Sequence, residues 1–287
     1  MAALISPIVV SCCSLASTTY SVVKRKLRRP TNHEEPICPS CSESPAMSAS
    51  RSSADQILAH LHRVEQERHQ RAHEPTLGAR VRDVKSYQHQ RFARSHSALL
   101  ESPRYCEAST FFLEHLYGPE DFSNRDDQFA RVVPAMVKLF PADVIDTVAA
   151  LAELHAISEH LDTRMATHIS EDAPLDRAAY VRAWQATGEA NLRRRQIDLS
   201  VDIGKRLDRL TRNPLIRHSL RMMRGPAKAA GLSELQKFLE AGFEAFRAMR
   251  GANDFLERID QQERRLADEL DAAEPPFQSD TLIEMLP

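Results

Sequence analysis

The chain has 287 residues, of which 42% are hydrophobic and 27% are charged, and its formal net charge at pH 7 is −2. These values are typical of a folded protein that buries a core. Only 8 residues are glycine, which argues against a sheet-rich fold with many tight turns. The G-x-G-x-x-G and G-x-x-x-x-G-K-[ST] patterns do not occur, so the sequence offers no support for nucleotide binding by these two routes.

The first 46 residues differ in composition from the rest of the chain. They are rich in serine, proline and cysteine and show no helical periodicity. Serines and threonines interrupt their apolar stretch, and the basic cluster follows that stretch instead of preceding it. We therefore expect neither a secretory signal peptide nor stable membrane insertion. Residues 1–46 are predicted to be a disordered extension, or to be absent from the native protein because translation starts at Met47.

The positions of the cysteines indicate the redox compartment. Four of the five cysteines lie in the N-terminal extension, and Cys106 is the one that remains in the predicted folded region. A disulfide framework inside that region is therefore excluded, which favours a reducing compartment and a cytoplasmic protein. The C-x-x-C at 38–41 lacks the second pair of ligands that a zinc ribbon needs.

From residue 54 onward, apolar residues recur at the spacing of α-helices, and no segment shows the sustained alternation of a strand. A polar first helix around residues 57–64 is followed by a second helix that begins near Thr76. Ser102-Pro103 places a capping residue before a proline, which is typical of a helix start. This third helix is expected to end at Gly118-Pro119.

The middle of the chain contains the longest predicted helices. A capping box at residues 123–126 opens the fourth helix. The next and most apolar helix is predicted from Pro141 to about Ile169, and another long helix from about Leu175 to Leu210.

The last part of the chain is also helical. Asn213-Pro214 starts a short helix that Gly225-Pro226 is expected to end. Helical spacing then places seven residues on one continuous face: Leu235, Phe238, Leu239, Gly242, Phe243, Phe246 and Met249. A final amphipathic helix carries Phe255, Ile259 and Leu266. The sequence thus predicts an all-α, single-domain helical bundle of about eight or nine helices over residues 47–273, followed by a flexible C-terminal tail at 274–287.

Two stretches carry a family resemblance. The segment Phe111–Arg131 reads FFLEHLYGPEDFSNRDDQFAR, and Leu139-Phe140-Pro141 precedes the helix that contains Leu151–Asp162. Together they resemble a family of uncharacterised bacterial proteins with the signature FFLxxLYGPxDF, over about residues 55–260. The resemblance implies a helical, intracellular protein. It assigns no catalytic residue and no cofactor, because the family has no assigned activity.

A polar group on the longest helix is the first candidate site. His155 and Glu159 are four residues apart and His155 and Asp162 are seven apart, so all three share the apolar face of the helix. Ser158 lies beside them, and Arg195 from the following helix also falls on an apolar stripe. The candidate buried polar cluster is therefore His155, Ser158, Glu159, Asp162 and Arg195. An internal hydrogen-bond network is the favoured interpretation, since the Glu-x-x-His pairs of a di-iron site are missing.

Six histidines crowd the first two predicted helices: His60, His62, His69, His73, His89 and His96. Their spacing permits a surface metal site, but their many charged neighbours favour a solvated face. We assign no metal ligands.

The charged residues are unevenly distributed. Residues 177–228 contain 13 basic and 4 acidic side chains, whereas residues 101–176 contain 5 basic and 15 acidic ones. The candidate anion-binding residues in the basic segment are Arg193, Arg194, Lys205, Arg206 and Arg209. Consecutive arginines point in different directions around a helix, and no nucleic-acid-binding motif accompanies them. Pairing of this segment with the acidic segment is the simpler interpretation.

These patterns leave three hypotheses for function. The first is interaction with an unknown protein partner or self-association, with Phe255, Ile259 and Leu266 of the final helix as an oligomer contact. The second is an enzyme or sensor with a small-molecule or metal pocket inside the bundle, centred on His155, Glu159 and Asp162. The third is binding of an anion or nucleic acid through residues 177–228, with nucleic acid the less favoured partner.

Overall fold

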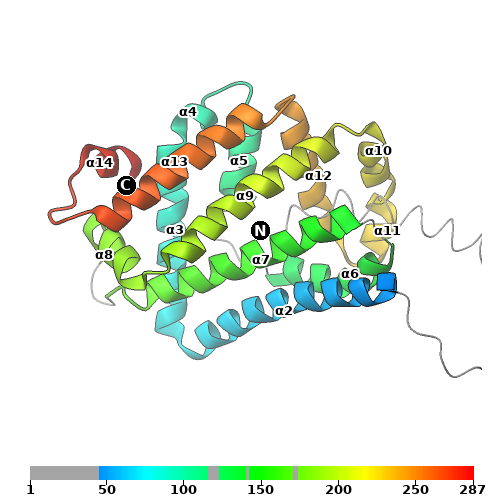
Figure 1. Cartoon of the computed structure of the whole chain (residues 1–287), viewed down its shortest axis with the longest axis horizontal. Helices are drawn as coiled ribbons and strands as arrows, with labels where there is room; N and C mark the ends of the chain where they lie inside the picture. Colours follow the sequence, from blue (N-terminus) through cyan, green and yellow to red (C-terminus); the bar gives the residue numbers. More distant parts are fainter. Residues whose placement is uncertain (1–44, 116–122, 140–141, 171–173) are drawn as a thin grey trace, which may run out of the picture.

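The computed structural model describes residues 45–115, 123–139, 142–170 and 174–287. Within these ranges every regular element is an α-helix, and there are thirteen of them (Figure 1). They are α2 (Pro45–His73), α3 (Pro75–Ser95), α4 (Ser97–Leu100), α5 (Cys106–His115), α6 (Ser123–Leu139), α7 (Ala142–Ala166), α8 (Arg177–Thr187), α9 (Ala190–Thr211), α10 (Pro214–Met222), α11 (Arg224–Ala229), α12 (Ser233–Ala248), α13 (Asn253–Ala272) and α14 (Asp280–Met285). The predicted all-α class is confirmed. The count is higher than eight or nine because short helices such as α4, α11 and α14 join the longer ones.

Four long helices lie side by side in the front of the molecule. Figure 1 shows α2, α7, α9 and α13 as successive rows, and each packs against the next. Helices α3, α5, α6 and α12 lie behind these rows, and α3 packs against α7. The small helices α8 and α14 lie at one end of the molecule, and α10 and α11 lie at the other.

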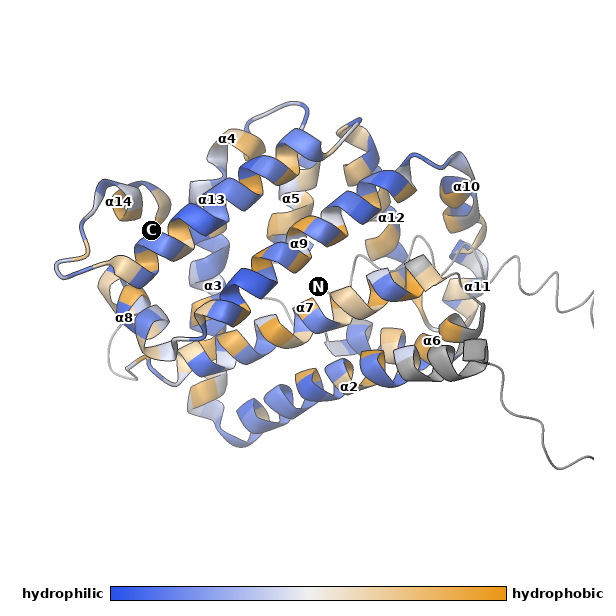
Figure 2. Cartoon of the chain, in the orientation of Figure 1, coloured by the Kyte–Doolittle hydropathy of each residue, from blue (hydrophilic) through white to orange (hydrophobic). Residues whose placement is uncertain are grey.

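Amphipathic sequences produce this layering. Figure 2 shows hydrophilic residues along the outward sides of α2, α9 and α13, with hydrophobic residues turned toward the interior. The seven residues of the predicted face are all buried, six of them on α12 and Met249 directly after its last residue. A helix with one apolar stripe is stable in water only when that stripe is covered, so each helix depends on its neighbours. Among the described helices, none combines the length and apolar character that a membrane-spanning segment needs.

The apolar core consists of two clusters. The larger cluster fills the space between α2, α3, α5, α6, α7, α9, α12 and α13 and includes Phe92, Phe112, Leu154 and Ile259. The smaller cluster lies at the end of the molecule that carries α8 and α14. Its members are Leu77, Val81, Val84, Tyr87, Met165, Ala166, Ile169, Tyr180, Val181, Ala183, Trp184, Leu266, Ala267, Leu270, Phe277, Leu282, Met285 and Leu286.

The prediction of one helix from Leu175 to Leu210 is wrong. The chain forms α8 and α9 instead, with Gly188 at φ 63° and Glu189 at φ 61° between them. A glycine adopts this left-handed conformation without the steric cost that a side chain imposes. Asp176 begins α8 by accepting a hydrogen bond from the Ala179 N–H at 2.8 Å. The break changes the direction of the chain, and α8 and α9 each bury one side in the interior.

The C-terminal residues differ from the expected flexible tail. Within 274–287 the chain forms α14, which Ser279 caps by accepting a hydrogen bond from the Leu282 N–H at 3.3 Å. Phe277, Leu282, Met285 and Leu286 are buried in the smaller cluster. Their apolar side chains cover residues of α3, α8 and α13 that would otherwise face water, which is why this segment packs. The predicted N-terminal extension lies outside the described residues except for its last two positions, which belong to α2.

Gly242→Ala is expected to destabilise the fold by about 1–3 kcal/mol, because it overpacks the core. A Cβ atom at Gly242 would lie 2.9 Å from Cζ of the buried Phe111, whose ring is packed against Phe112 and Phe238. Urea denaturation measures the effect. Gly225→Ala in α11 is the matched control, since its Cβ would meet no atom within 4 Å, and it should leave stability unchanged or slightly higher. Equal stability of the two variants would contradict the close approach of α5 and α12.

Candidate functional site

A cavity of about 120 Å³ lies where the two apolar clusters meet. Its wall includes Phe92, Phe112, Leu154 and Ile259 from the larger cluster, and Tyr180, Trp184, Leu266 and Ala267 from the smaller one. The remaining lining residues are mostly polar or charged: Lys85, Gln88, Arg91, His155, Ser158, Glu159, Asp162, Arg193, Gln196, Ile197, Ser200 and Glu263. An apolar cavity of about 150 Å³ holds benzene, so this slightly smaller cavity is in the size range of a compact organic molecule.

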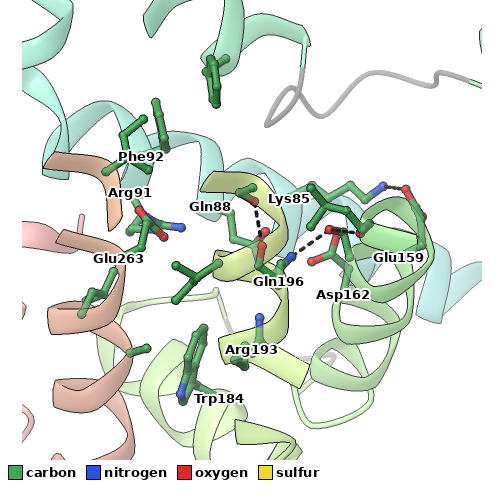
Figure 3. Close-up of a pocket in the computed structure, with 18 of the residues that line it drawn as sticks. Lys85, Gln88, Arg91, Phe92, Glu159, Asp162, Trp184, Arg193, Gln196 and Glu263 are labelled. Carbon is green, nitrogen blue, oxygen red and sulfur yellow. Dashed lines mark hydrogen bonds and ion pairs between the residues drawn. The ribbon is translucent and has the colours of Figure 1, made fainter. Parts of the chain in front are cut away.

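Four helices supply the charged groups of the wall. Figure 3 shows Arg91 and Glu263 on one side of the cavity and Lys85, Glu159 and Asp162 on the opposite side, with Gln196 and Arg193 between them. Lys85 and Arg91 come from α3, Glu159 and Asp162 from α7, Arg193 and Gln196 from α9, and Glu263 from α13, while α8 contributes aromatic rings.

Glu159 is held by two cations from two different helices. Its Oε2 lies 2.5 Å from Nη2 of Arg71 on α2, and its Oε1 lies 2.7 Å from Nζ of Lys85 on α3. Burial alone would raise the pKa of the Glu159 carboxyl, but Lys85 and Arg71 outweigh it and hold this pKa well below its usual range. The carboxylate is therefore ionised and joins α2, α3 and α7.

Glu263 forms a similar group on the other side of the cavity. Its Oε1 accepts hydrogen bonds from Arg91 and, at 2.8 Å, from Nε2 of the buried His96. Burial would raise the pKa of Glu263, but Arg91 and His96 lower it to about 2. Both glutamates of the wall are therefore already balanced by cations or donors of the protein.

Asp162 is different because no cation lies within ion-pair distance of it in the described structure. It is 8% exposed, and the Gln88 side chain is its hydrogen-bond partner. Burial, with a smaller contribution from Glu159, raises the pKa of Asp162 to about 6, although Lys85 and Arg193 act in the opposite direction. This carboxyl group therefore exchanges its proton at a pH close to neutral.

Arg193 is a buried guanidinium that is 5% exposed. It lies over the ring of Trp184, with Cζ 3.9 Å from the ring centroid, and Trp184 in turn donates a hydrogen bond from Nε1 to Asp271 at 2.7 Å. Among the described residues, the polar contact of Arg193 is between its Nη2 and the sulfur of Met165, which are 3.8 Å apart. Burial lowers the pKa of the guanidinium, and Tyr180 and Asp162 oppose that shift.

His155 and Ser158 line the cavity but bond mainly to the protein. The Nε2 of His155 lies 2.9 Å from Oδ2 of Asp126 on α6, which also pairs with Arg68 at 2.5 Å. Burial lowers the pKa of His155 despite this carboxylate, so a neutral imidazole donates its Nε2–H. Ser158 donates to the Leu154 carbonyl and accepts from Gln196 at 2.8 Å.

The structure brings together four of the five residues in the predicted polar cluster: His155, Ser158, Glu159 and Asp162. Arg195 is not among them. Its side chain is 49% exposed and forms a bidentate pair with Glu153 at 2.8 Å on the outside of α7 and α9. Two residues earlier on α9, Arg193 is the arginine that faces the cavity, because residues two apart point about 200° away from each other around a helix.

The predicted anion-binding residues do not form one surface. Arg193 is buried, Arg206 is half-buried, and Arg194, Lys205 and Arg209 are exposed. The expected pairing with the acidic segment 101–176 occurs for Arg195, but Arg217 and Arg224 pair with Glu244 and Glu240 of α12 instead. The basic segment therefore binds largely to helices that follow it in the chain.

Sequence reasoning missed Lys85, Arg91, Trp184 and Glu263 as members of one site. They come from three helices, and their single positions carry no motif. The six histidines also fail to converge: His96 binds Glu263, whereas His62 and His69 are exposed on α2. Among the described residues, no group of three or more His, Cys, Asp or Glu side chains is arranged to hold a metal ion.

Comparison with known families places this cavity inside a recognised domain. Residues 67–276 match the family described as a domain of unknown function, DUF8198. The chain belongs to this family. All lining residues of the cavity lie within the DUF8198 match, whereas most of α2 and all of α14 lie outside it. No curated protein and no solved structure matches the chain.

Proposed function

We propose that this protein binds a small molecule in the cavity between α3, α7, α8, α9 and α13 and acts as a sensor or an enzyme. The observation that carries the proposal is a cavity of about 120 Å³ with charged, amide and aromatic side chains in one wall. Protein interiors are close-packed, with few voids larger than a water molecule. Ligand sites typically combine apolar and aromatic side chains with convergent polar groups, and this wall contains both kinds of side chain.

Self-association through the final long helix has less support. The hypothesis relied on Phe255, Ile259 and Leu266, and all three are buried in the chain's own core. A contact surface on that face of α13 would require the helix to leave the bundle, which exposes the apolar area that stabilises it.

A nucleic-acid interface in residues 177–228 also has less support. Such an interface needs exposed cations on one surface and shows a steep dependence on salt. Arg193 faces the interior, and Arg217 and Arg224 are paired with carboxylates of α12. The cations that remain exposed on α9 lie next to acidic residues such as Asp202.

Ala267→Leu is expected to abolish ligand binding, because the added carbon atoms enter the cavity from α13. Native mass spectrometry of the full-length chain, with extraction of any bound molecule, measures retention. A thermal-shift screen of aromatic and aliphatic acids, amides and amines measures binding of added compounds. The wild-type chain should retain a small molecule or be stabilised by one of these compounds, and the variant should show neither effect.

Ala272→Leu is the matched control on the same helix, because Ala272 is exposed and lies outside the wall. It should bind as the wild type does. A wild-type chain that carries no small molecule and responds to no compound, or a response that Ala267→Leu leaves unchanged, would contradict the proposed function.

A further inference from the structure

The cavity contains a cation that the protein itself does not neutralise at close range. Arg193 is buried, yet within the described residues no carboxylate lies at ion-pair distance from its guanidinium. Its Nε has no hydrogen-bond partner among the residues that the structure describes. An arginine carries five N–H donors, and a buried charge without a partner is costly. The stacking on Trp184 positions the planar group but satisfies none of these donors.

The other charges in the wall leave this position positive. Glu159 already binds two cations, Arg71 and Lys85, and Glu263 already binds Arg91 and His96. Asp162 is the remaining acid, and it is bonded to Gln88. Three cations (Lys85, Arg91 and Arg193) and three carboxyl groups (Glu159, Asp162 and Glu263) line the cavity. Arg71 adds a fourth cation beside Glu159, so the group carries an excess of positive charge that grows when Asp162 is protonated. An anion is the ligand charge that corrects this imbalance.

The shape and chemistry of the wall restrict the kind of anion. A guanidinium presents parallel N–H donors that match the two oxygens of a carboxylate. The rings of Trp184, Tyr180, Phe92 and Phe112 line the same cavity, and aromatic walls favour an apolar or aromatic ligand body. A volume of about 120 Å³ limits that body to roughly one ring or a short aliphatic chain.

We propose that the ligand of this cavity is a small organic carboxylate whose carboxylate binds Arg193 and whose aromatic or aliphatic body packs against Trp184 and Tyr180. This proposal rests on the proposed function and adds the chemical class of the ligand. The amide of Gln196 and the hydroxyl of Ser200 face the same cavity and offer further hydrogen bonds to polar substituents of the ligand. Because Glu159 and Glu263 are occupied by protein cations, Arg193 remains the group that is open to an incoming anion.

The test compares three carboxylates with their uncharged amides on the full-length chain: benzoate, phenylacetate and hexanoate against benzamide, phenylacetamide and hexanamide. Isothermal titration calorimetry gives the affinities after any co-purified molecule has been removed. At least one carboxylate should bind the wild type about 10-fold or more tightly than its amide, because a charge-assisted pair is stronger than a neutral hydrogen bond.

Arg193→Met should weaken binding of that carboxylate by about 10–100-fold and leave its amide nearly unchanged. Arg194→Met is the matched control, because Arg194 is the next residue on α9 and is exposed, and it should bind as the wild type does. Arg193→Lys keeps the charge and removes the planar pair of donors, so its affinity should lie between those of wild type and Arg193→Met. If Arg193→Met does not fold, the comparison of acids with amides on the wild type still decides.

The two proposals fail in different ways. Amides that bind as tightly as the acids, with binding lost in Ala267→Leu, would overturn the carboxylate assignment and keep the cavity as a ligand site. Carboxylate binding that Arg193→Met leaves unchanged would overturn the role of Arg193. Absence of binding by every compound, together with a wild-type chain that retains no small molecule, would overturn both proposals.

Discussion

Glu159→Gln is expected to lower the free energy of unfolding by about 3–5 kcal/mol, which is the cost of breaking a buried ion pair. The substitution keeps the shape of the side chain but removes its charge. Arg71 and Lys85, whose side chains are 10% and 21% exposed, then both lose the carboxylate to which they are paired. Urea denaturation of wild type and variant at neutral pH measures the difference.

The pH dependence of this difference follows from the direction of the pKa shift. The pKa of Glu159 is lower in the folded protein than in the unfolded chain. Its contribution to stability is therefore fully present above the unfolded pKa of about 4.5 and is lost as the pH falls toward the folded pKa. Wild type and Glu159→Gln should differ most near pH 7 and converge in acid.

Glu153→Gln is the matched control on the same helix. Glu153 pairs with Arg195 on the outside of the bundle, where both side chains contact water. An exposed pair contributes about 0–1 kcal/mol, so this variant should lose little stability. A loss for Glu159→Gln no larger than that for Glu153→Gln would show that the group of Arg71, Lys85 and Glu159 is not a buried connection between helices.

Local periodicity was sufficient to predict several elements of this fold. The face of α12 was predicted correctly because apolar residues at spacings of three and four form one stripe along a helix. In a helical bundle such a stripe is buried against neighbouring helices. The same helical spacing places His155, Glu159 and Asp162 on one stripe of α7, and all three are buried. These predictions depend on neighbours within one helix, which a single sequence contains.

The break between α8 and α9 could not be predicted in this way. An isolated glycine inside a periodic pattern is tolerated in a helix at a cost of about 1 kcal/mol, so Gly188 did not decide between a break and a continuous helix. The position of the break sets the rotation of α9 about its axis. That rotation turns Arg193 inward and Arg195 outward, and the sequence pattern alone favoured the wrong arginine of the two.

The ion-pair partners of the site's carboxylates could not be predicted from the sequence for a different reason. Glu159 on α7 pairs with Lys85, which is 74 residues earlier, and Glu263 pairs with Arg91, which is 172 residues earlier. Ion pairs between distant helices depend on which helices become neighbours, and no local rule states that. The same reasoning explains why the C-terminal segment was expected to be flexible: its apolar residues gain partners only after α3, α8 and α13 have packed.

Asp162→Asn is expected to raise the stability of the protein at neutral pH by about 1–3 kcal/mol. The pKa of Asp162 is about 6 in the folded protein and 3.8 in the reference state. Between these two values the unfolded chain loses a proton that the folded protein keeps, so the wild type becomes less stable as the pH rises through this window. Asparagine has no proton to lose and keeps an amide that can bond to Gln88. The stabilisation by Asp162→Asn should therefore be about 1 kcal/mol larger at pH 7.5 than at pH 5, as urea denaturation at the two pH values measures.

Asp146→Asn on the exposed side of the same helix is the control, and its effect should be small at both pH values. Lys85, Glu159 and Arg193 are the charged groups that act on Asp162, from α3, α7 and α9 respectively. If Asp162→Asn were less stable than the wild type at pH 7.5, the attraction of the Asp162 carboxylate to Lys85 and Arg193 would exceed the cost of its burial.

A buried carboxyl group that lowers stability at neutral pH, next to an arginine without a close partner, is costly for folding alone. Groups that weaken a fold are commonly kept where binding or catalysis needs them. If Asp162→Asn stabilises the protein and also changes carboxylate affinity, the cost of this carboxyl group is linked to the ligand. A stabilised variant with unchanged affinity would separate Asp162 from ligand binding and leave Arg193 as the group that selects the anion.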